Sequence, residues 1–338
     1  MKSERLGIIF VVLFSLAVLF LLILILGDDP VRSFYFFFIG PFRNVFNFGN
    51  MLNAAVPLML GALGIIIAMK AGNLNLGGEG QIYLGAFITT ITALALPLSG
   101  FMGAIFAVLA GSICAGALGA ISGVCKAKWN VNELISSFLL SCAVLPIINY
   151  MVQGPFLNQE TSLISTEKIA ESMRLPLILR PSNLNVGFFI ALLFIFLIQY
   201  FLNKTRMGYE FRMAGHNEMF ARYGGINTKL NTVLSLFFSG SLYGLAGSIA
   251  VLGTHYAVIK EFSAGLGWSG LTVALIAGFS PAAVLPCALF LSWINSGARI
   301  AMQNTGLTYE IAVIVQAVIF LLSTSLAIRT AFNKKRKV

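Results

Sequence analysis

Long apolar segments separated by short polar ones dominate the pattern along this chain. A helix that crosses a membrane needs about 20 mostly apolar residues, and most of the apolar segments approach that length. The pair 268–280 and 283–299 is shorter and is separated by Ser280-Pro281, so it forms either two helices or one broken, re-entrant element. We therefore predict about ten transmembrane helices, over residues 6–26, 52–70, 75–96, 101–122, 133–152, 186–203, 232–252, 268–280, 283–299 and 308–328.

Composition supports the same class of protein. Apolar residues make up 58% of the chain and charged residues 10%, whereas soluble domains carry about 25% charged residues. The mean hydropathy is +0.90. These values predict an all-α, polytopic integral membrane protein embedded in a lipid bilayer. The net charge of +10 lies almost wholly in the loops, so we attribute it to membrane orientation and not to nucleic acid.

The distribution of Lys and Arg predicts that orientation. Cytoplasmic loops are enriched in these residues, and an even number of spans places both termini on the cytoplasmic side. With that arrangement, 15 of the 22 Lys and Arg residues are cytoplasmic. They are Lys2, Arg5, Lys70, Lys126, Lys128, Lys204, Arg206, Arg212, Arg222, Lys229, Arg329, Lys334, Lys335, Arg336 and Lys337.

The polar segments divide a single transmembrane domain, 1–338, into regions. Residues 1–30 are predicted to form an N-terminal anchor helix, because their apolar run is too long for a signal peptide and lacks a small-residue cleavage site. Residues 153–185 read as an extracytoplasmic loop with one short helix. Residues 203–231 form a cytoplasmic loop between the two halves, and 329–338 a basic cytoplasmic tail.

A polar, Gly-rich stretch, Ala71–Phe87, joins two apolar segments with the sequence AGNLNLGGEGQIYLGAF. Lipid cannot satisfy its amide and carboxylate groups, and irregular backbone at membrane depth is tolerated only where it is buried in protein or lines a wet cavity. We predict that it lines a pathway for a polar substrate, opposed by an aromatic ring and a hydroxyl group. The predicted pathway residues are Asn73, Asn75, Glu79, Gln81, Trp268 and Ser269.

Several of these residues have a structural alternative. Asn73 and Asn75 are also suited to cap helices. Glu79 is equally suited to pair, as a buried carboxylate, with a backbone group or with Lys70. Trp268 is typical of the aromatic belt at a membrane interface. The pattern alone leaves both interpretations open.

A short sequence recurs in the two halves of the chain. Leu76-Gly77-x-x-Gly80 matches Leu266-Gly267-x-x-Gly270, and in the predicted topology the two apolar runs enter the membrane from opposite sides. This is consistent with an inverted repeat of two five-helix halves, and transporters built in this way bind substrate near the midplane. The same spacing of glycines also permits close helix packing, so either explanation fits.

The cytoplasmic loop contains a second distinctive stretch, Gly208–Asn227, with the sequence GYEFRMAGHNEMFARYGGIN. Asn217 is suited to cap a short helix that Gly224-Gly225 ends. Met219, Phe220 and Tyr223 then share one face, next to Arg222. Such a helix either docks into a groove of a partner or lies against the membrane interface.

Taken together, these residues resemble the permease subunits of ATP-binding cassette importers, in the branch for simple sugars, branched-chain amino acids and nucleosides. The resemblance includes Val131–Ile135, Leu252–Tyr256, Ser263–Gly278 and Gly306–Gln316 besides the two stretches above, and extends from about Asn50 to the end of the last apolar run. The Gly-Glu-Gly-Gln sequence and the Leu-Gly-Thr-His-Tyr region are most similar to the nucleoside importers.

The resemblance implies a division of labour among subunits. The expected partners are a cytoplasmic ATPase, a second permease (the same chain or a paralogue) and an extracytoplasmic substrate-binding lipoprotein, at a bacterial plasma membrane. The chain contains no G-x-x-x-x-G-K-[ST] sequence, so ATP and Mg²⁺ are expected in the ATPase and no cofactor in this chain. The implied coupling residues are Gly215, Asn217, Glu218, Met219, Phe220, Arg222, Tyr223 and Gly224.

Other functions fit the sequence less well. One alternative is an importer of the same kind whose substrate is a monosaccharide such as ribose or galactose. An ion-coupled secondary transporter usually places ionisable relays within its spans, and here only Glu79, Glu133 and Glu310 lie near membrane depth. An enzyme is not indicated, because the two histidines lie on opposite sides and neither a catalytic constellation nor a metal-binding spacing is present.

Overall fold

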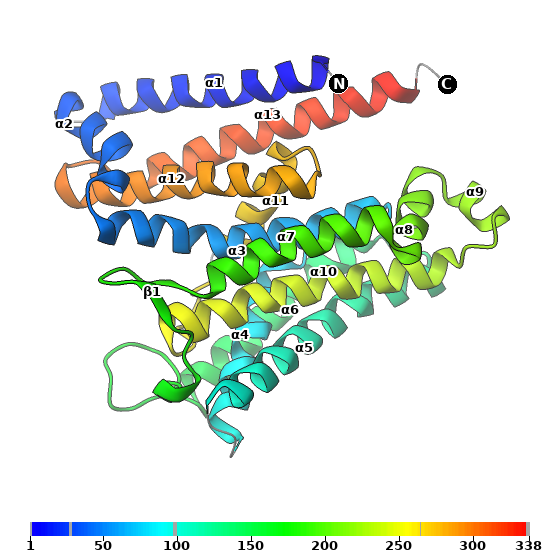
Figure 1. Ribbon diagram of the computed structural model, residues 1–338, viewed down its shortest axis with the longest axis horizontal. Helices are drawn as coiled ribbons and strands as arrows, with labels where there is room; N and C mark the ends of the chain where they lie inside the picture. The colour runs from blue at the N-terminus through cyan, green and yellow to red at the C-terminus, as the bar shows by residue number, and fades with distance from the viewer. Residues whose placement is uncertain (1, 27–28, 97–99, 264, 336–338) are drawn as a thin grey trace.

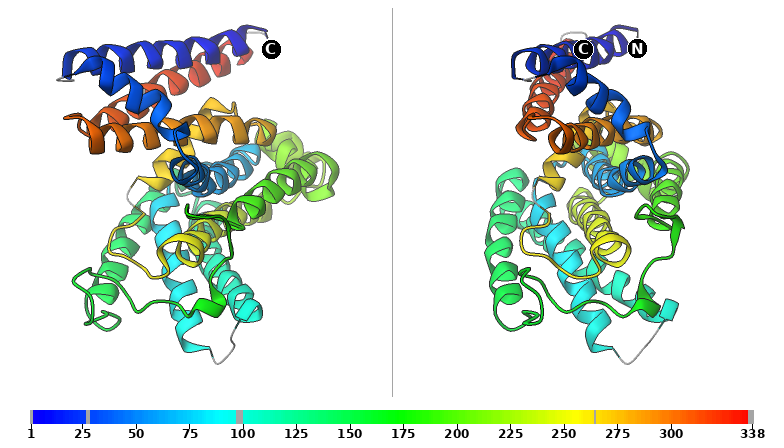
Figure 2. Two further views of the ribbon diagram at one scale, coloured as in Figure 1. Left: turned by 60° about the vertical axis from the view of Figure 1, so that its left-hand side comes forward. Right: turned by 90° about the vertical axis from the view of Figure 1, so that its left-hand side faces the viewer.

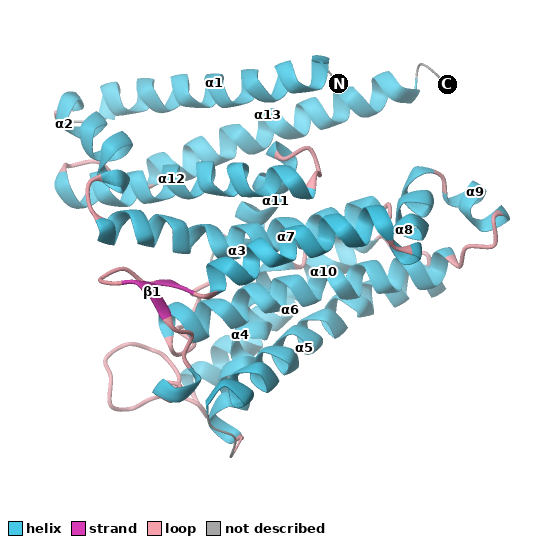
Figure 3. Ribbon diagram, viewed as in Figure 1, coloured by secondary structure: helices cyan, strands magenta, loops and turns pink. Residues whose placement is uncertain are grey.

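Helices form most of the described chain (Figure 3). The computed structural model describes residues 2–26, 29–96, 100–263 and 265–335. In chain order its α-helices are α1 (Lys2–Leu26), α2 (Pro30–Phe34), α3 (Val45–Lys70), α4 (Gly78–Ala95), α5 (Gly100–Trp129), α6 (Glu133–Gln153), α7 (Gly187–Lys204), α8 (Arg206–His216), α9 (Glu218–Tyr223), α10 (Thr228–Ala250), α11 (Leu266–Ile276), α12 (Val284–Asn304) and α13 (Glu310–Lys335).

Shorter elements connect these helices. Single π-helical turns follow α2 and α10, and 3₁₀ turns precede α3 and α12 and lie in the loop after α6. Their bounds are Tyr35–Ile39, Val251–His255, Gly40–Phe42, Pro281–Ala283 and Glu171–Met173. That loop also contains an antiparallel pair of strands, β1 (Leu177–Leu179) and β2 (Leu184–Asn185), where the sequence predicted only a short helix.

The two ends of the helical bundle are different (Figure 1). At one end, the α9 end, lie α8 and α9 together with the first turn of α1 and the last turn of α13. At the other, the β1 end, lie the strands and the long loop that precedes them. The predicted cytoplasmic elements therefore lie at the same end, although the side of the membrane is still a prediction.

The helices form layers around α3, as the two further views make clear (Figure 2). On one side α12 packs on α3, with α1 and α13 beyond it; on the other, α10 packs on α3, with α4 and α5 beyond it. The segments of α3 and α10 are 78% buried inside the protein, against 22% for α6 and 28% for α7. A helix that is apolar all round and buried in this way belongs to a core.

Each of the ten predicted apolar runs overlaps a helix for most of its length, but not all of these helices have the length of a span. Among the described residues, six helical segments are long and apolar enough to cross a membrane: Val45–Lys70, Gly100–Trp129, Glu133–Gln153, Gly187–Lys204, Thr228–His255 and Pro281–Asn304. The helix α11 has only 11 residues, as the break at Ser280-Pro281 suggested. Ten spans and the inverted repeat remain predictions.

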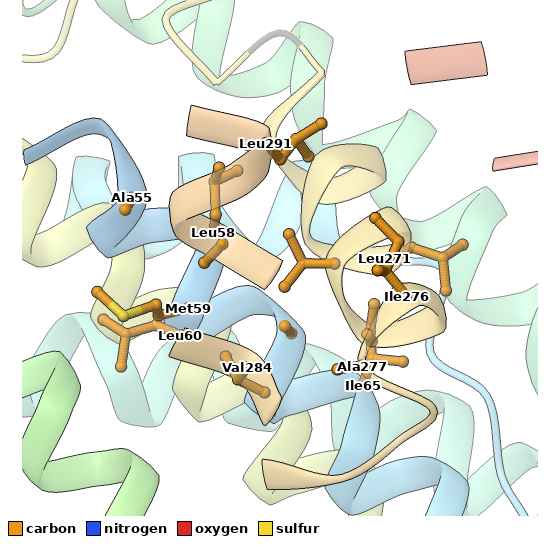
Figure 4. Close-up of a cluster of buried hydrophobic side chains, with 14 of the residues drawn as sticks. Ala55, Leu58, Met59, Leu60, Ile65, Leu271, Ile276, Ala277, Val284 and Leu291 are labelled. Carbon is orange, nitrogen blue, oxygen red and sulfur yellow. The ribbon is translucent and has the colours of Figure 1, made fainter. Parts of the chain in front are cut away.

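The main hydrophobic core joins α3 to the short helix α11 and to α12 (Figure 4). Leu58 and Ile65 of α3 belong to this cluster together with Leu271 of α11 and Leu291 of α12, and each of these side chains is at most 6% exposed. Burying a side chain of this kind contributes about 1.5–3 kcal/mol. The core thus fixes α11 against α3, and this positions the segment that precedes α11.

Small residues bring α5 and α10 into direct backbone contact. A Cβ atom added at Gly119 of α5 would lie 2.4 Å from the carbonyl oxygen of Leu236, and one at Gly240 of α10 would lie 2.5 Å from that of Ala115. Such close approach through small residues is typical of helix pairs in membranes, where dispersion forces take the place of the hydrophobic effect.

Candidate functional site

The polar stretch after α3 is an irregular segment that returns from the α9 end to the start of α4. Two buried amide side chains hold it. Asn73 donates to the hydroxyl of Ser235 at 2.8 Å, and Asn75 donates to that of Ser239 at 3.0 Å. Both serines are on α10, one helical turn apart, so the segment is fixed along one face of that helix.

Further polar atoms of this segment are also paired. Asn75 and Gln81 exchange hydrogen bonds of 2.8 and 3.2 Å between their amide groups. The backbone amides of Leu76 and Gly80 donate to Ser137 and Ser141 on α6. Because leaving a buried polar group unpaired costs about 1–3 kcal/mol, this network gives the polar stretch a single conformation within an apolar bundle.

A charged pair closes the network at the α9 end. The Lys126 Nζ atom lies 2.8 Å from Glu133 Oε1 and donates to Asn73 Oδ1, also at 2.8 Å. The side chains are 26% and 13% exposed. Glu133 is in the first turn of α6, as expected for an acidic residue at a helix N-terminus, and its partner on α5 holds it against the polar stretch.

Glu79 binds the start of α11. Its two carboxylate oxygens accept hydrogen bonds from the backbone amides of Gly265 at 2.7 Å and Gly267 at 2.9 Å. A Cβ atom on Gly267 would lie 2.6 Å from the Glu79 backbone nitrogen, so only glycine allows this approach. The two Leu-Gly-x-x-Gly motifs therefore meet, and a carboxylate sits at the positive end of a helix dipole.

A cavity of about 820 Å³ lies between α3, α10, α11, α12 and α13. Its lining comes from the parts of α3, α10, α12 and α13 near the β1 end. The volume is within the range of about 300–1,000 Å³ that is usual for small-molecule sites. The polar lining residues are Asn47, Asn50, Asn53, Asn183, Thr254, His255, Ser269, Thr272, Ser292, Asn295, Ser296, Arg299, Gln303, Tyr309 and Gln316.

Trp268 lies where this cavity meets a second, much smaller one. The small cavity, of about 10 Å³, is lined by Asn75, Glu79, Tyr243 and others, and Trp268 lines both. The Trp268 ring centroid is 6.4 Å from that of Phe138 on α6 and also 6.4 Å from that of Phe320 on α13. Trp268 is therefore shared by the large cavity and the small one, and it contacts an aromatic ring from α6 and one from α13.

Of the predicted pathway residues, the structure places two at the large cavity. Trp268 and Ser269 line it, and Ser269 accepts a hydrogen bond of 2.9 Å from Gln316. The other four do not line it. Asn73, Asn75 and Gln81 belong to the buried amide network and are at most 2% exposed, and Glu79 lies against α11. The side chain of neither Asn73 nor Asn75 caps an α-helix; both join the polar stretch to its neighbours.

Most cavity residues were not predicted from the sequence. On α3, Asn47, Asn50 and Asn53 follow one another at intervals of three residues, and α12 carries Ser292, Asn295, Ser296 and Arg299 on one face. This helical spacing of polar side chains is the signal that would have found them, because a polar stripe on an apolar helix faces protein or water.

The predicted short helix after α8 is present as α9. Asn217 caps it by accepting a hydrogen bond of 3.0 Å from Phe220 N, and Gly225 beyond its end has a φ of +79°. Arg222 pairs with Glu218 at 2.7 Å. Met219, Phe220 and Tyr223 are 68%, 62% and 86% exposed. The helix therefore presents an apolar face that no described residue covers.

The end of α8 touches the polar stretch through backbone atoms. A Cβ atom added at Gly215 would lie 2.3 Å from the Lys70 carbonyl oxygen and 2.9 Å from the Gly72 nitrogen. No side chain fits between these two segments. A displacement of α8 therefore acts directly on the segment that carries Asn73 and Asn75.

Comparison with known proteins gives a consistent result. Residues 47–324 match the family described as the branched-chain amino acid transport system / permease component. A probable riboflavin import permease protein of Treponema pallidum is 32% identical, over 92% of this chain and 83% of that protein.

Other relatives are named for other cargoes. A guanosine ABC transporter permease protein of Bacillus subtilis is 28% identical, over 96% of this chain and 95% of the relative. A glucose ABC transporter permease protein of Haloferax volcanii is 27% identical, over 92% and 84%. No solved structure gives a significant match.

Proposed function

Because the chain belongs to the permease component family of branched-chain amino acid transport systems, we propose that it forms the translocation pathway for nucleosides in an ATP-driven importer. The observation that carries the proposal is the amide-lined cavity of about 820 Å³ at the β1 end of a polytopic bundle. Energy then comes from ATP hydrolysis in a separate subunit.

The chemistry of the cavity suits a nucleoside. Asn and Gln side chains both donate and accept hydrogen bonds, as the edges of bases and the hydroxyls of ribose require. Trp268 and Phe320 offer aromatic faces on which a base can stack. The relatives named for guanosine and for riboflavin carry cargoes that join a planar heterocycle to a polyol, which is the chemistry of this lining.

A monosaccharide is the second candidate cargo. The relative named for glucose supports it, and the amides and hydroxyls of the cavity would bind sugar hydroxyls as well. The exposed aromatic ring of Trp268, which is 43% exposed, favours the nucleoside, because a base gains from stacking.

In the proposed importer, the α9 end is cytoplasmic. The exposed face of α9 docks on the ATPase, and the contact between Gly215 and Gly72 carries its movement to the polar stretch. The β1 end faces outward and receives substrate from a binding lipoprotein, and a second permease subunit completes the pathway. The large cavity is then the outward-facing part of the path, and the three rings around Trp268 close it inward.

Uptake of labelled guanosine, uridine and ribose tests this proposal in cells that express the chain with its neighbouring subunits. A parallel strain carries the ATPase with its phosphate-loop lysine replaced. We expect nucleoside uptake that is lost in that strain. Uptake that survives in that strain would indicate a secondary carrier. Uptake of ribose alone would indicate an ATP-driven importer whose substrate is a monosaccharide.

A further inference from the structure

The large cavity has one positively charged side chain, that of Arg299, among neutral polar groups. The described residues that line it include no Asp, Glu or Lys and no other Arg. No described carboxylate pairs with Arg299; its Nε atom has only a long contact of 3.5 Å to the Asn295 carbonyl oxygen within the same helix. A guanidinium group has five N–H donors and no acceptor, so it is free to bind acceptor atoms of a ligand.

The neighbouring polar groups on α12 are free as well. Among the described residues, no partner bonds to the side chains of Asn295, Ser296 or Gln303, which all line the cavity. By contrast, Asn53 is engaged with Thr254 at 2.9 Å, and Gln316 with Ser269 at 2.9 Å. Four unengaged polar side chains of the cavity, those of Asn295, Ser296, Arg299 and Gln303, therefore share one helix, α12, while Asn183, His255 and Tyr309 are unengaged elsewhere in the described lining.

We propose that Arg299 and Asn295 read the base of the transported nucleoside and favour 6-oxopurines over 6-aminopurines. The inference rests on the proposed function and adds a base preference to it. Arg299 would donate to O6 and N7, which are adjacent acceptors on a 6-oxopurine and the usual target of arginine on guanine. Asn295, one turn away, would accept from the N1–H group through its amide oxygen.

A 6-aminopurine presents the wrong pattern of hydrogen-bond donors and acceptors to Arg299 and Asn295. Its exocyclic amino group is a donor at the position where the oxo group is an acceptor. Facing a guanidinium group, that donor has no partner. No carboxylate among the described lining residues is present to accept from it. The discrimination therefore comes from an unpaired donor, which is costly, and not only from a gained hydrogen bond.

The test compares inosine with adenosine, which differ in the purine ring only at position 6 and in the proton on N1. The complete importer is reconstituted in vesicles with internal ATP, and the initial uptake rates are measured at equal, subsaturating concentrations. The variant is Arg299→Gln. The matched control is Arg43→Gln, an exposed arginine near the same end that contacts the Phe36 ring at 5.9 Å and does not line the cavity.

The binding lipoprotein is a separate, unchanged chain, so a change in the uptake ratio between variants arises in the permease. We expect Arg299→Gln to lower the inosine-to-adenosine ratio about five- to tenfold. This is the lower part of the range for one bidentate contact, because the Arg299 side chain is exposed. Arg43→Gln should leave the ratio unchanged. Subunit assembly, checked by co-purification of the ATPase, must be equal in all three proteins.

Three results would overturn the proposal. An unchanged ratio in Arg299→Gln, or an equal loss of both uptakes, would remove Arg299 from base recognition. Competition by inosine 5′-monophosphate that depends on Arg299, with an unchanged nucleoside ratio, would indicate a phosphate contact instead. Absence of any nucleoside uptake by the unmodified importer would refute the proposed function itself, which separates the two failures.

Discussion

Replacing Glu79 by alanine is expected to destabilise the junction between α4 and α11. The carboxylate accepts hydrogen bonds from the backbone amides of Gly265 and Gly267, at 2.7 and 2.9 Å. The alanine side chain has no acceptor. The two N–H groups at the start of α11 would then have to find water or remain unpaired.

The two groups differ in what that loss costs. Gly265 is exposed, so water replaces the carboxylate there, whereas Gly267 is buried. A buried donor without a partner costs about 1–3 kcal/mol, and the loss of a negative charge at a helix N-terminus costs about 0.3–1 kcal/mol. Together these predict that Glu79→Ala lowers the free energy of unfolding by about 1.3–4 kcal/mol.

Thermal unfolding of the purified protein in detergent measures the effect. We expect a lower melting temperature for Glu79→Ala and a smaller decrease for Glu79→Gln, which retains one acceptor oxygen. Glu310→Ala is the matched control, because Glu310 is also in the first turn of a helix but is exposed. An unchanged melting temperature in Glu79→Ala, together with reduced uptake, would refute the structural role and assign Glu79 to the substrate pathway.

Three further variants test the other parts of the proposal. Gly215→Val should push α8 away from Gly72 and lower ATP-driven uptake while the ATPase still co-purifies; normal uptake would contradict the direct contact. Phe220→Asp should abolish co-purification of the ATPase, whereas Tyr209→Asp on the exposed part of α8 should not, and retention of the ATPase by the former would exclude docking through α9. Trp268→Ala should allow nucleosides to leak through without ATP hydrolysis, whereas Trp293→Phe should not, and tight vesicles with the former would remove Trp268 from the barrier.

The positions of the helices could be predicted from the sequence because lipid imposes a simple rule. A long apolar segment has one stable solution in a membrane, a helix whose backbone groups are paired internally. The helix α6 begins at the predicted residue, Glu133, and α7 at Gly187, one residue after the predicted start. The start of α3 at Val45, well before the predicted residue 52, was missed because Asn47 and Asn50 look like loop residues but face a cavity.

The role of each polar residue was harder to predict. The stretch around Asn73 and Asn75 was recognised as unusual because polar groups are costly in lipid, and the structure pairs these groups with Ser235 and Ser239. Those partners are more than 160 positions away in sequence. Composition and spacing carry no information on such pairing, so a buried structural network and a substrate path look alike from sequence.

The cavity itself depended on the same long-range packing. Trp268 and Ser269, which lie inside the Leu266-Gly267-x-x-Gly270 motif, were predicted as the aromatic ring and hydroxyl group opposite the polar stretch. The amides on α3 and the polar face of α12, in contrast, become one site only when these helices pack side by side. Arg299 illustrates the difficulty. The predicted topology makes it one of seven positive charges outside the cytoplasmic set, and the sequence does not distinguish it from a residue at the membrane surface.

The backbone contact between α5 and α10 has a consequence for natural variants of this protein. Changing Gly240 to alanine makes the helix slightly more apolar, so a score based on hydropathy or on residue class would rate it as harmless. The added methyl group would nevertheless lie 2.5 Å from the Ala115 carbonyl oxygen, and the two helices would have to separate. At this interface the volume of each side chain is constrained and its polarity is not. A substitution that disrupts the helix pair can therefore look conservative by residue class.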